Sequence, residues 1–412
     1  MILKIKFFFI MNYLFKSFIF CYLLFSFNIY SQSEKVIAGP MVSFIDAYGT
    51  QIWFLLSKSA KKIEFDIKDY DKDKLWEYDF EVDSKNIKEE FFPYTVKLEK
   101  LLPNKEYIAT VYVDGEFVKE IDIFTKRPHL DDVQFLIGSN LKNPSATMLS
   151  NMRKTNSDFM VWLGGHVNLD KSNSYDEIIS KYVDARKNTV LNNFLTSTPQ
   201  IATWNDHDFN YKNNLTGDLM VDSSYFAFNA FWPNSLQKTY NYTYFDYGTY
   251  QRYTYNDVDI FLLDACSFRS ENNLYGDKQI ERLFQELNNT GSTFTIIASP
   301  IPFTEKNNEL DFSDFKTQYD YFLYRLKMSE NNGCILLSSS ENKNVGTKLL
   351  ELEIHDDVKN INFNEFNISH LSNNNYSLVS IKGSKGNRKL TFETYNENGN
   401  ILFSKTLHEN EL

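Results

Sequence analysis

Short runs of apolar residues, divided by polar turn signals, fill the chain from residue 34 to residue 127. Their lengths and their partial alternation of apolar and polar positions predict strands over 51–56, 62–67, 94–98, 106–113 and 117–124. Asp114-Gly115, between the last two runs, is typical of a tight hairpin turn. We therefore expect a small all-β sandwich over residues 34–127. A linker should follow at Lys126-Arg127-Pro128, because proline stops strand pairing.

The pattern changes at residue 132, where buried strands begin to alternate with helices. We expect strands at 133–137, 158–163, 200–203, 259–264, 294–299 and 334–338, and helices near 144–155, 174–195, 276–288 and 311–329. This alternation predicts a layered α/β domain over 132–408. Runs at 376–382, 388–395 and 400–407 should add antiparallel strands, the last two joined by Asn398-Gly399. The Asn- and Tyr-rich segment 205–256 is interpreted as a long ordered insertion near the site.

Residues 1–32 have the features of a secretory signal peptide. Lysines flank or interrupt apolar runs, residues 17–29 form an apolar core, and small residues at 30–33 offer a cleavage site. The alternative is an uncleaved anchor, for which this core is short. We expect an exported protein that is periplasmic, on the outer surface or secreted. No transmembrane segment is expected after signal cleavage, because no later run is long and apolar enough.

The charge balance excludes some classes of partner. The formal net charge is −11, and removal of three leader lysines (Lys4, Lys6 and Lys16) would bring the mature chain to near −14. Such an acidic chain argues against nonspecific nucleic-acid binding and against an anionic membrane surface. Cys266 and Cys334 lie in apolar strand-like runs, so we expect buried thiols in preference to a disulfide.

Polar residues follow several predicted strands, at the edge where ligands bind in open α/β sheets. These strand ends carry residues 138–140, 164–166, 204–208, 264–269 and 338–342. The most informative is Trp204-Asn205-Asp206-His207-Asp208, which places two carboxylates, an amide and an imidazole in consecutive positions. Oxygen and imidazole donors of this kind are ligands for metal cations.

The order and spacing of these motifs resemble those of PhoD-like alkaline phosphatases, within the calcineurin-like metallophosphoesterases. The resemblance covers about 133–407, and a fibronectin type III-like N-terminal domain is also usual in that family. Leu101 to Tyr107 resembles the tyrosine corner of such a domain. The resemblance implies a layered αββα metallophosphoesterase domain that hydrolyses phosphate esters. Two metal ions would polarise the phosphoryl group and supply a hydroxide nucleophile.

Compared with the family's motifs, the charged ligand positions are largely replaced. The thiolate, bridging aspartate, ligand tyrosine, late aspartate and late histidine correspond here to Asn140, Gly165, Asn168, Ser340 and Asn342. His166 stands for an asparagine, Asn205 for the first aspartate of its motif, and Cys266 for an arginine. The matching residues are Asp206, His207, Asp208, Leu263, Asp264 and Arg269. The scaffold of the motifs is kept while most of the anionic ligands are absent.

We therefore predict a catalytically degenerate phosphatase that binds a phosphate-containing ligand or an extracytoplasmic protein, with no cofactor. The alternative is an active hydrolase with a rearranged site, holding iron, calcium or another divalent metal on His166, Asp206 and His207. In that case His207 and Arg269 would be catalytic, with Asp206 and His166 as the metal ligands. Arg269 could equally clamp a phosphate or form a salt bridge. The sequence does not determine the oligomeric state.

Overall fold

The computed structural model of the protein describes residues 34–69, 74–125, 132–141, 144–170, 172, 174–210, 220–234, 248–303, 310–329, 333–340, 346–351, 362–369 and 371–411. The expected signal peptide at 1–32 and the linker at 126–128 lie outside these residues. None of the helices in the described part of the chain is long and apolar enough to cross a membrane.

Two antiparallel sheets form the N-terminal part of the structure. One has the order β1-β2-β5, with strands Val36–Val42, Gly49–Ser57 and Phe91–Glu99. The other has the order β4-β3-β6-β7, with strands Lys74–Glu81, Lys62–Asp69, Glu106–Val113 and Glu116–Phe124. Inward-facing side chains such as Phe54, Phe65 and Val111 form one apolar cluster between the sheets. The Tyr107 hydroxyl accepts a hydrogen bond of 2.9 Å from the Leu102 amide, the contact expected of a tyrosine corner.

A six-stranded sheet of order β10-β9-β8-β17-β18-β19 follows. Its strands are Gln200–Thr203, Phe159–Leu163, Val133–Gly138, Asn375–Lys382, Lys389–Asn396 and Ile401–His408. β8, β9 and β10 are parallel, so their carboxyl ends meet at one edge. The helices packed on this sheet share its apolar cluster; they are α2 (Ala146–Lys154), α3 (Tyr175–Arg186), α4 (Thr189–Leu195) and α7 (Met220–Phe231).

A second six-stranded sheet has the order β11-β12-β13-β14-β16-β15. Its strands are Gln251–Tyr255, Val258–Leu262, Phe294–Ser299, Cys334–Ser340, Asn362–Ser369 and Gly346–Glu351. The four central strands are parallel. Helices α9 (Asp277–Leu287) and α10 (Lys316–Met328) cover one face of this sheet. A third apolar cluster, including Phe135 and Ile296, lies between the two six-stranded sheets.

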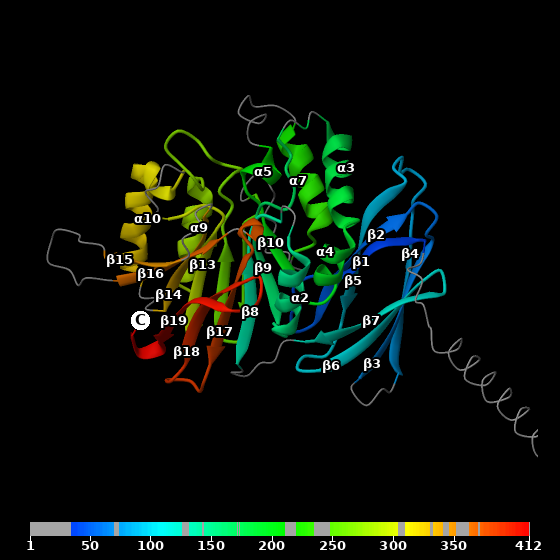
Figure 1. Ribbon diagram of the computed structural model, residues 1–412, viewed down its shortest axis with the longest axis horizontal. Helices are drawn as coiled ribbons and strands as arrows, with labels where there is room; N and C mark the ends of the chain where they lie inside the picture. Colours follow the sequence, from blue (N-terminus) through cyan, green and yellow to red (C-terminus); the bar gives the residue numbers. More distant parts are fainter. Residues whose placement is uncertain are drawn as a thin grey trace, which may run out of the picture.

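The molecule is thus a mixed α/β protein in which two sheets lie between two groups of helices (Figure 1). The N-terminal sheets lie beside α2 and α4 at the right of that view. Ala38 and Trp53 from these sheets belong to the same apolar cluster as α3, α4 and α7. Cys266 and Cys334 are buried free thiols, as predicted.

Several predicted elements differ from the structure. The helical stretch expected over 174–195 is divided into two helices, α3 and α4, because Asn188 caps α4. The helix expected over 311–329 is divided into a 3₁₀ turn, Phe312–Asp314, and α10. The segment 205–256 contains α7 and strand β11, as well as the short helix α5 (Asp206–Phe209). Strands β1, β4, β11, β15 and β16 were not predicted.

Candidate functional site

The loops after β8 and β9 are hydrogen-bonded to each other at the parallel-strand edge. The Asn140 amide donates to the Gly164 carbonyl at 2.9 Å, and the Leu141 amide donates to the Gly165 carbonyl at 2.7 Å. Gly165 has φ +74, and a Cβ built on it would lie 2.6 Å from the Cα of Asn140. The position where the family resemblance implies a bridging carboxylate is therefore closed by backbone, so a side chain there needs a backbone shift.

Asp208 holds the loop after β9 in place. Its carboxylate accepts hydrogen bonds from the amides of Gly165 (2.7 Å), His166 (2.8 Å) and Val167 (3.0 Å). The Asn205 amide donates to the same carboxylate at 3.2 Å, which completes a capping box at the start of α5. Asp208 is fully buried, and these backbone donors compensate its charge. Its carboxylate is used to shape the loop.

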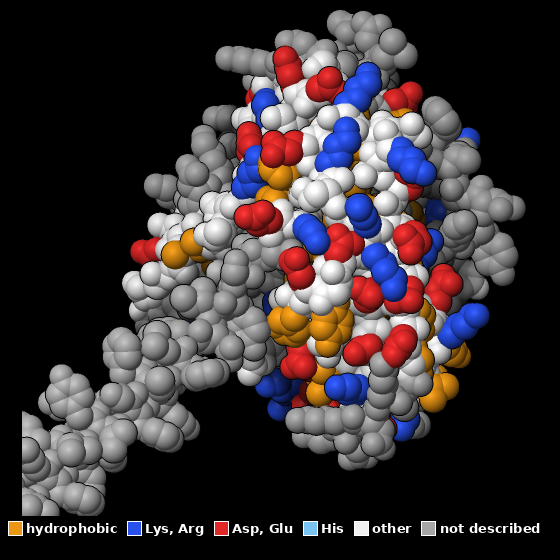
Figure 2. All heavy atoms as spheres, turned by 90° about the vertical axis from the view of Figure 1, so that its right-hand side faces the viewer, with side chains coloured by type: hydrophobic (Ala, Val, Ile, Leu, Met, Phe, Trp, Pro, Cys, Tyr) orange, Lys and Arg blue, Asp and Glu red, His pale blue; other side chains and the backbone are white. Residues whose placement is uncertain are grey.

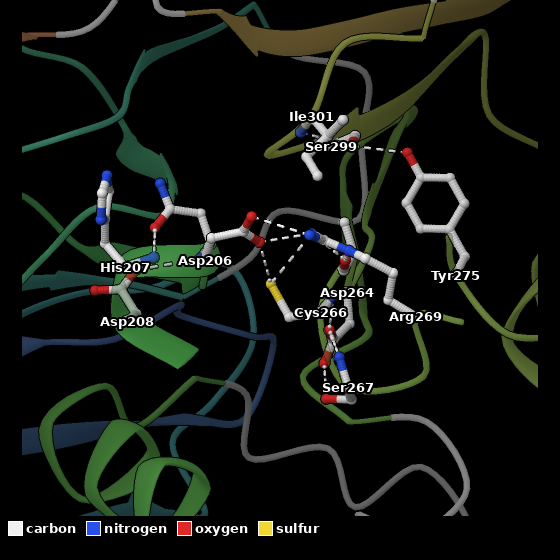
Figure 3. A network of polar contacts seen from close by, with 12 residues as sticks. Asp206, His207, Asp208, Asp264, Cys266, Ser267, Arg269, Tyr275, Ser299 and Ile301 are labelled. Atoms are coloured by element: carbon white, nitrogen blue, oxygen red, sulfur yellow. Dashed lines mark hydrogen bonds and ion pairs between the residues drawn. The ribbon is translucent and has the colours of Figure 1, made fainter. Parts of the chain in front are cut away.

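Asp206, at the start of α5 after β10, and Arg269, in the turn after β12, form a bidentate ion pair. Arg269 donates from Nη1 to Oδ2 at 2.9 Å and from Nη2 to Oδ1 at 2.5 Å. The Cys266 thiol donates to Oδ1 of Asp206 at 3.4 Å. Figure 3 shows the Asp206 carboxylate pointing toward Arg269 and Cys266, while His207 points away from them. Burial, followed by the nearby Asp206 charge, raises the pKa of the Cys266 thiol well above its usual range, so this thiol stays protonated.

Asp264 caps the turn that follows β12. Its carboxylate accepts from the amides of Cys266 (2.8 Å) and Ser267 (2.9 Å), and from the Thr249 amide (2.8 Å). These contacts orient the 264–269 turn, and with it the side chains of Cys266 and Arg269.

The two histidines lie in different surroundings. The His166 ring is buried among aromatic side chains, with its centroid 4.3 Å from that of Trp232, and its Nε2 lies 2.9 Å from the Thr203 carbonyl oxygen. Because a carbonyl only accepts, Nε2 carries the hydrogen; burial lowers the pKa of this imidazole. His207 is more exposed, and its Nδ1 lies 3.7 Å from Asp170.

The remaining predicted positions have structural contacts or lie outside the described chain. Asn168 accepts a hydrogen bond of 2.9 Å from the Asp170 amide. Ser340 is the last residue of β14, its side chain is outside the described part, and Asn342 lies outside it altogether.

Sequence reasoning missed two contacts at this edge. Ser139 and Ser339 hydroxyls lie 2.5 Å apart across the sheets, and the Ser338 hydroxyl donates to buried Glu365 at 2.7 Å. β16 carries Glu365 in an Asn-rich stretch, a signal for a loop more than for a strand.

The geometry of these side chains does not fit two metal ions. Asp206 faces a guanidinium whose positive charge opposes a cation, while Asp208 and Asp264 accept hydrogen bonds from backbone amides. Asp206, His166 and His207 have three separate sets of partners. Within the described ranges, no group of three or more His, Cys, Asp or Glu side chains is placed to hold a metal. Metal binding by Asp206 and His166 stays a prediction.

These features define a mixed α/β protein with a polar strand-end site, and its fold has a counterpart among solved structures. The structure of PhoD matches with a TM-score of 0.73 and 14% identity, covering 92% of this chain and 94% of that chain. The chain therefore has a PhoD-like fold, as the family resemblance implied. A Vps29 single mutant from Entamoeba histolytica matches with a TM-score of 0.26 and 7% identity, covering 67% of this chain and 99% of that chain. A TM-score this low does not show a shared fold. No family model matches the sequence, and no curated protein does.

Proposed function

We propose that this chain is an exported, PhoD-like phosphoesterase-fold protein that has lost its dinuclear metal centre and works by binding, not by hydrolysis. Its parts are a signal peptide (1–32), a fibronectin type III-like domain (34–127) and an αββα metallophosphoesterase domain (132–408). The partner is a phosphate-containing ligand or an extracytoplasmic protein.

One observation carries this proposal: the carboxylates at the strand ends are satisfied by the protein itself. Asp206 is paired with Arg269, Asp208 with three loop amides, and Asp264 with the turn that follows it. A metal centre needs converging anionic donors. Here the charge of each donor is already compensated by a guanidinium or by backbone amides, so a cation would gain little and would have to break existing bonds.

The outer face of the N-terminal sheets shows no concentrated basic patch among its described residues. Figure 2 shows acidic and basic side chains intermixed across the described residues of this face. Nucleic-acid binding relies on a concentrated basic field, which a mixed surface does not supply. The described part of this face therefore does not favour nucleic acid as a partner.

Metal content and turnover test this proposal. The purified mature protein is incubated with iron, calcium, zinc or manganese, desalted and measured by elemental analysis, then assayed with an aryl phosphate. We expect metal at background level and no chelator-sensitive turnover in the wild type. Near-stoichiometric metal, with turnover that is lost on chelation and in His207→Ala, would overturn the proposal and establish the hydrolase. Ile401→Ala, at an exposed position on the edge strand β19, is the control for His207→Ala: it should leave metal content and turnover as in the wild type.

A further inference from the structure

The Arg269 guanidinium is oriented by contacts that do not involve Asp206. Its Nε and Nη2 donate to the Ala265 carbonyl at 2.9 and 2.7 Å. The backbone of the 264–269 turn therefore fixes Nε and Nη2 of Arg269. Asp264 stabilises this turn by accepting hydrogen bonds from its amides. This arrangement aims the other edge of the guanidinium, Nη1 and Nη2, across to the neighbouring sheet. The orientation of the planar Arg269 guanidinium therefore does not depend on the Asp206 carboxylate.

Asp206 is the solvent-facing member of the pair. Its side chain is 43% exposed, whereas the Arg269 side chain is only 5% exposed. The carboxylate thus covers a buried guanidinium from outside. A carboxylate and one face of a phosphate offer the same pair of oxygens to an arginine fork. Phosphate oxyanions are consequently the class of ligand that could take the place of Asp206.

We infer that Arg269 is an oxyanion site whose built-in occupant is the Asp206 carboxylate, and that phosphate or a phosphomonoester binds by displacing it. This inference rests on the proposed function, because it describes anion binding without metal. A tethered carboxylate competes at an effective concentration of about millimolar or above. The wild-type protein therefore binds free phosphate weakly, and a ligand with further contacts is needed to open the pair.

The test compares phosphate binding to Asp206→Ala and wild-type protein by calorimetric titration in chelator, with inorganic phosphate and phenyl phosphate as probes. We expect Asp206→Ala to bind at least about tenfold more tightly than the wild type, and Asp206→Ala/Arg269→Gln to lose this gain. Tighter binding of phenyl phosphate identifies an ester as the ligand; equal binding identifies free phosphate.

Glu281→Ala is the matched control, because it also removes a half-exposed carboxylate paired with an arginine, Arg325, and changes the charge equally. It should leave phosphate binding unchanged. Should Asp206→Ala not fold, Asp206→Asn is tested by the rise in its melting temperature with phosphate against equal ionic strength of chloride.

The inference is overturned if Asp206→Ala binds no better than the wild type, or if the gain survives Arg269→Gln. Stoichiometric metal with a gain that persists in chelator would overturn the proposed function alone. Metal-free protein without a gain would overturn only this inference.

Discussion

At the residue scale, Gly165 shows how the fold has closed the space that a bridging carboxylate would need. Its φ of +74 is a conformation that costs an L-residue energy, and its missing side chain points at the Asn140 backbone. Gly115 offers a natural comparison, since it has φ +77 with no atom within 4 Å of a built Cβ. The two glycines share the backbone strain and differ in crowding.

We expect Gly165→Ala to lower the free energy of unfolding by about 2–4 kcal/mol, the sum of backbone strain and overpacking. Gly115→Ala should cost only about 1 kcal/mol, because strain acts alone there. Urea unfolding of both variants measures the difference. Equal losses at the two positions would mean that the loops after β8 and β9 adjust freely, and that the site is less closed than its geometry indicates.

At the element scale, most of the strands, and the polar residues at their ends, could be predicted from apolar runs and turn signals. What could not be predicted depends on tertiary partners. The sequence of β16 is rich in Asn and typical of a loop. Its pairing with β14 and β15 is what makes it a strand. The Asp206–Arg269 pair joins turns from two sheets, so neither residue's spacing along the chain reveals the other. The motif indicated the donors but not their partners.

The break between α3 and α4 gives a prediction at the same scale. Residues 187–188 contain neither glycine nor proline, and Asn188 caps the new helix: the Leu191 amide donates to Asn188 Oδ1 at 3.1 Å. Asn188→Ala should cost about 1 kcal/mol of unfolding free energy, and Asn188→Asp, which keeps the acceptor, far less. Chemical denaturation compares them. Equal effects would show that packing of α4, not its cap, sets the boundary.

At the scale of the whole molecule, cationic side chains connect the N-terminal sheets to the helices, and one of them is buried. Arg186 lies between Trp53 and Trp232, with Cζ 5.3 and 4.3 Å from their ring centroids. Burial lowers the pKa of Arg186 to about 10, so it remains charged at neutral pH. Trp53 also donates from Nε1 to the Ala230 carbonyl at 2.8 Å. These contacts join the all-β part to the helix face beside the strand-end site.

A second tie, from Lys119 on β7 to the Thr196 carbonyl at 2.6 Å, makes this junction sensitive to pH. Burial, and then the charge of Arg153, lowers the pKa of Lys119 from 10.5 to about 8. Between these values the unfolded chain binds more protons than the folded one, so the stability contributed by Lys119 rises with pH.

The measurement subtracts the unfolding free energy of Lys119→Met from that of the wild type at each pH. This difference should rise by about 1–2 kcal/mol between the two pKa values, after allowance for solvent screening. Lys97→Met, at an exposed position on β5, is the matched control for the loss of a lysine as such. A flat curve for Lys119→Met would mean that Lys119 reaches water and that the two parts of the molecule are less tightly joined at this point.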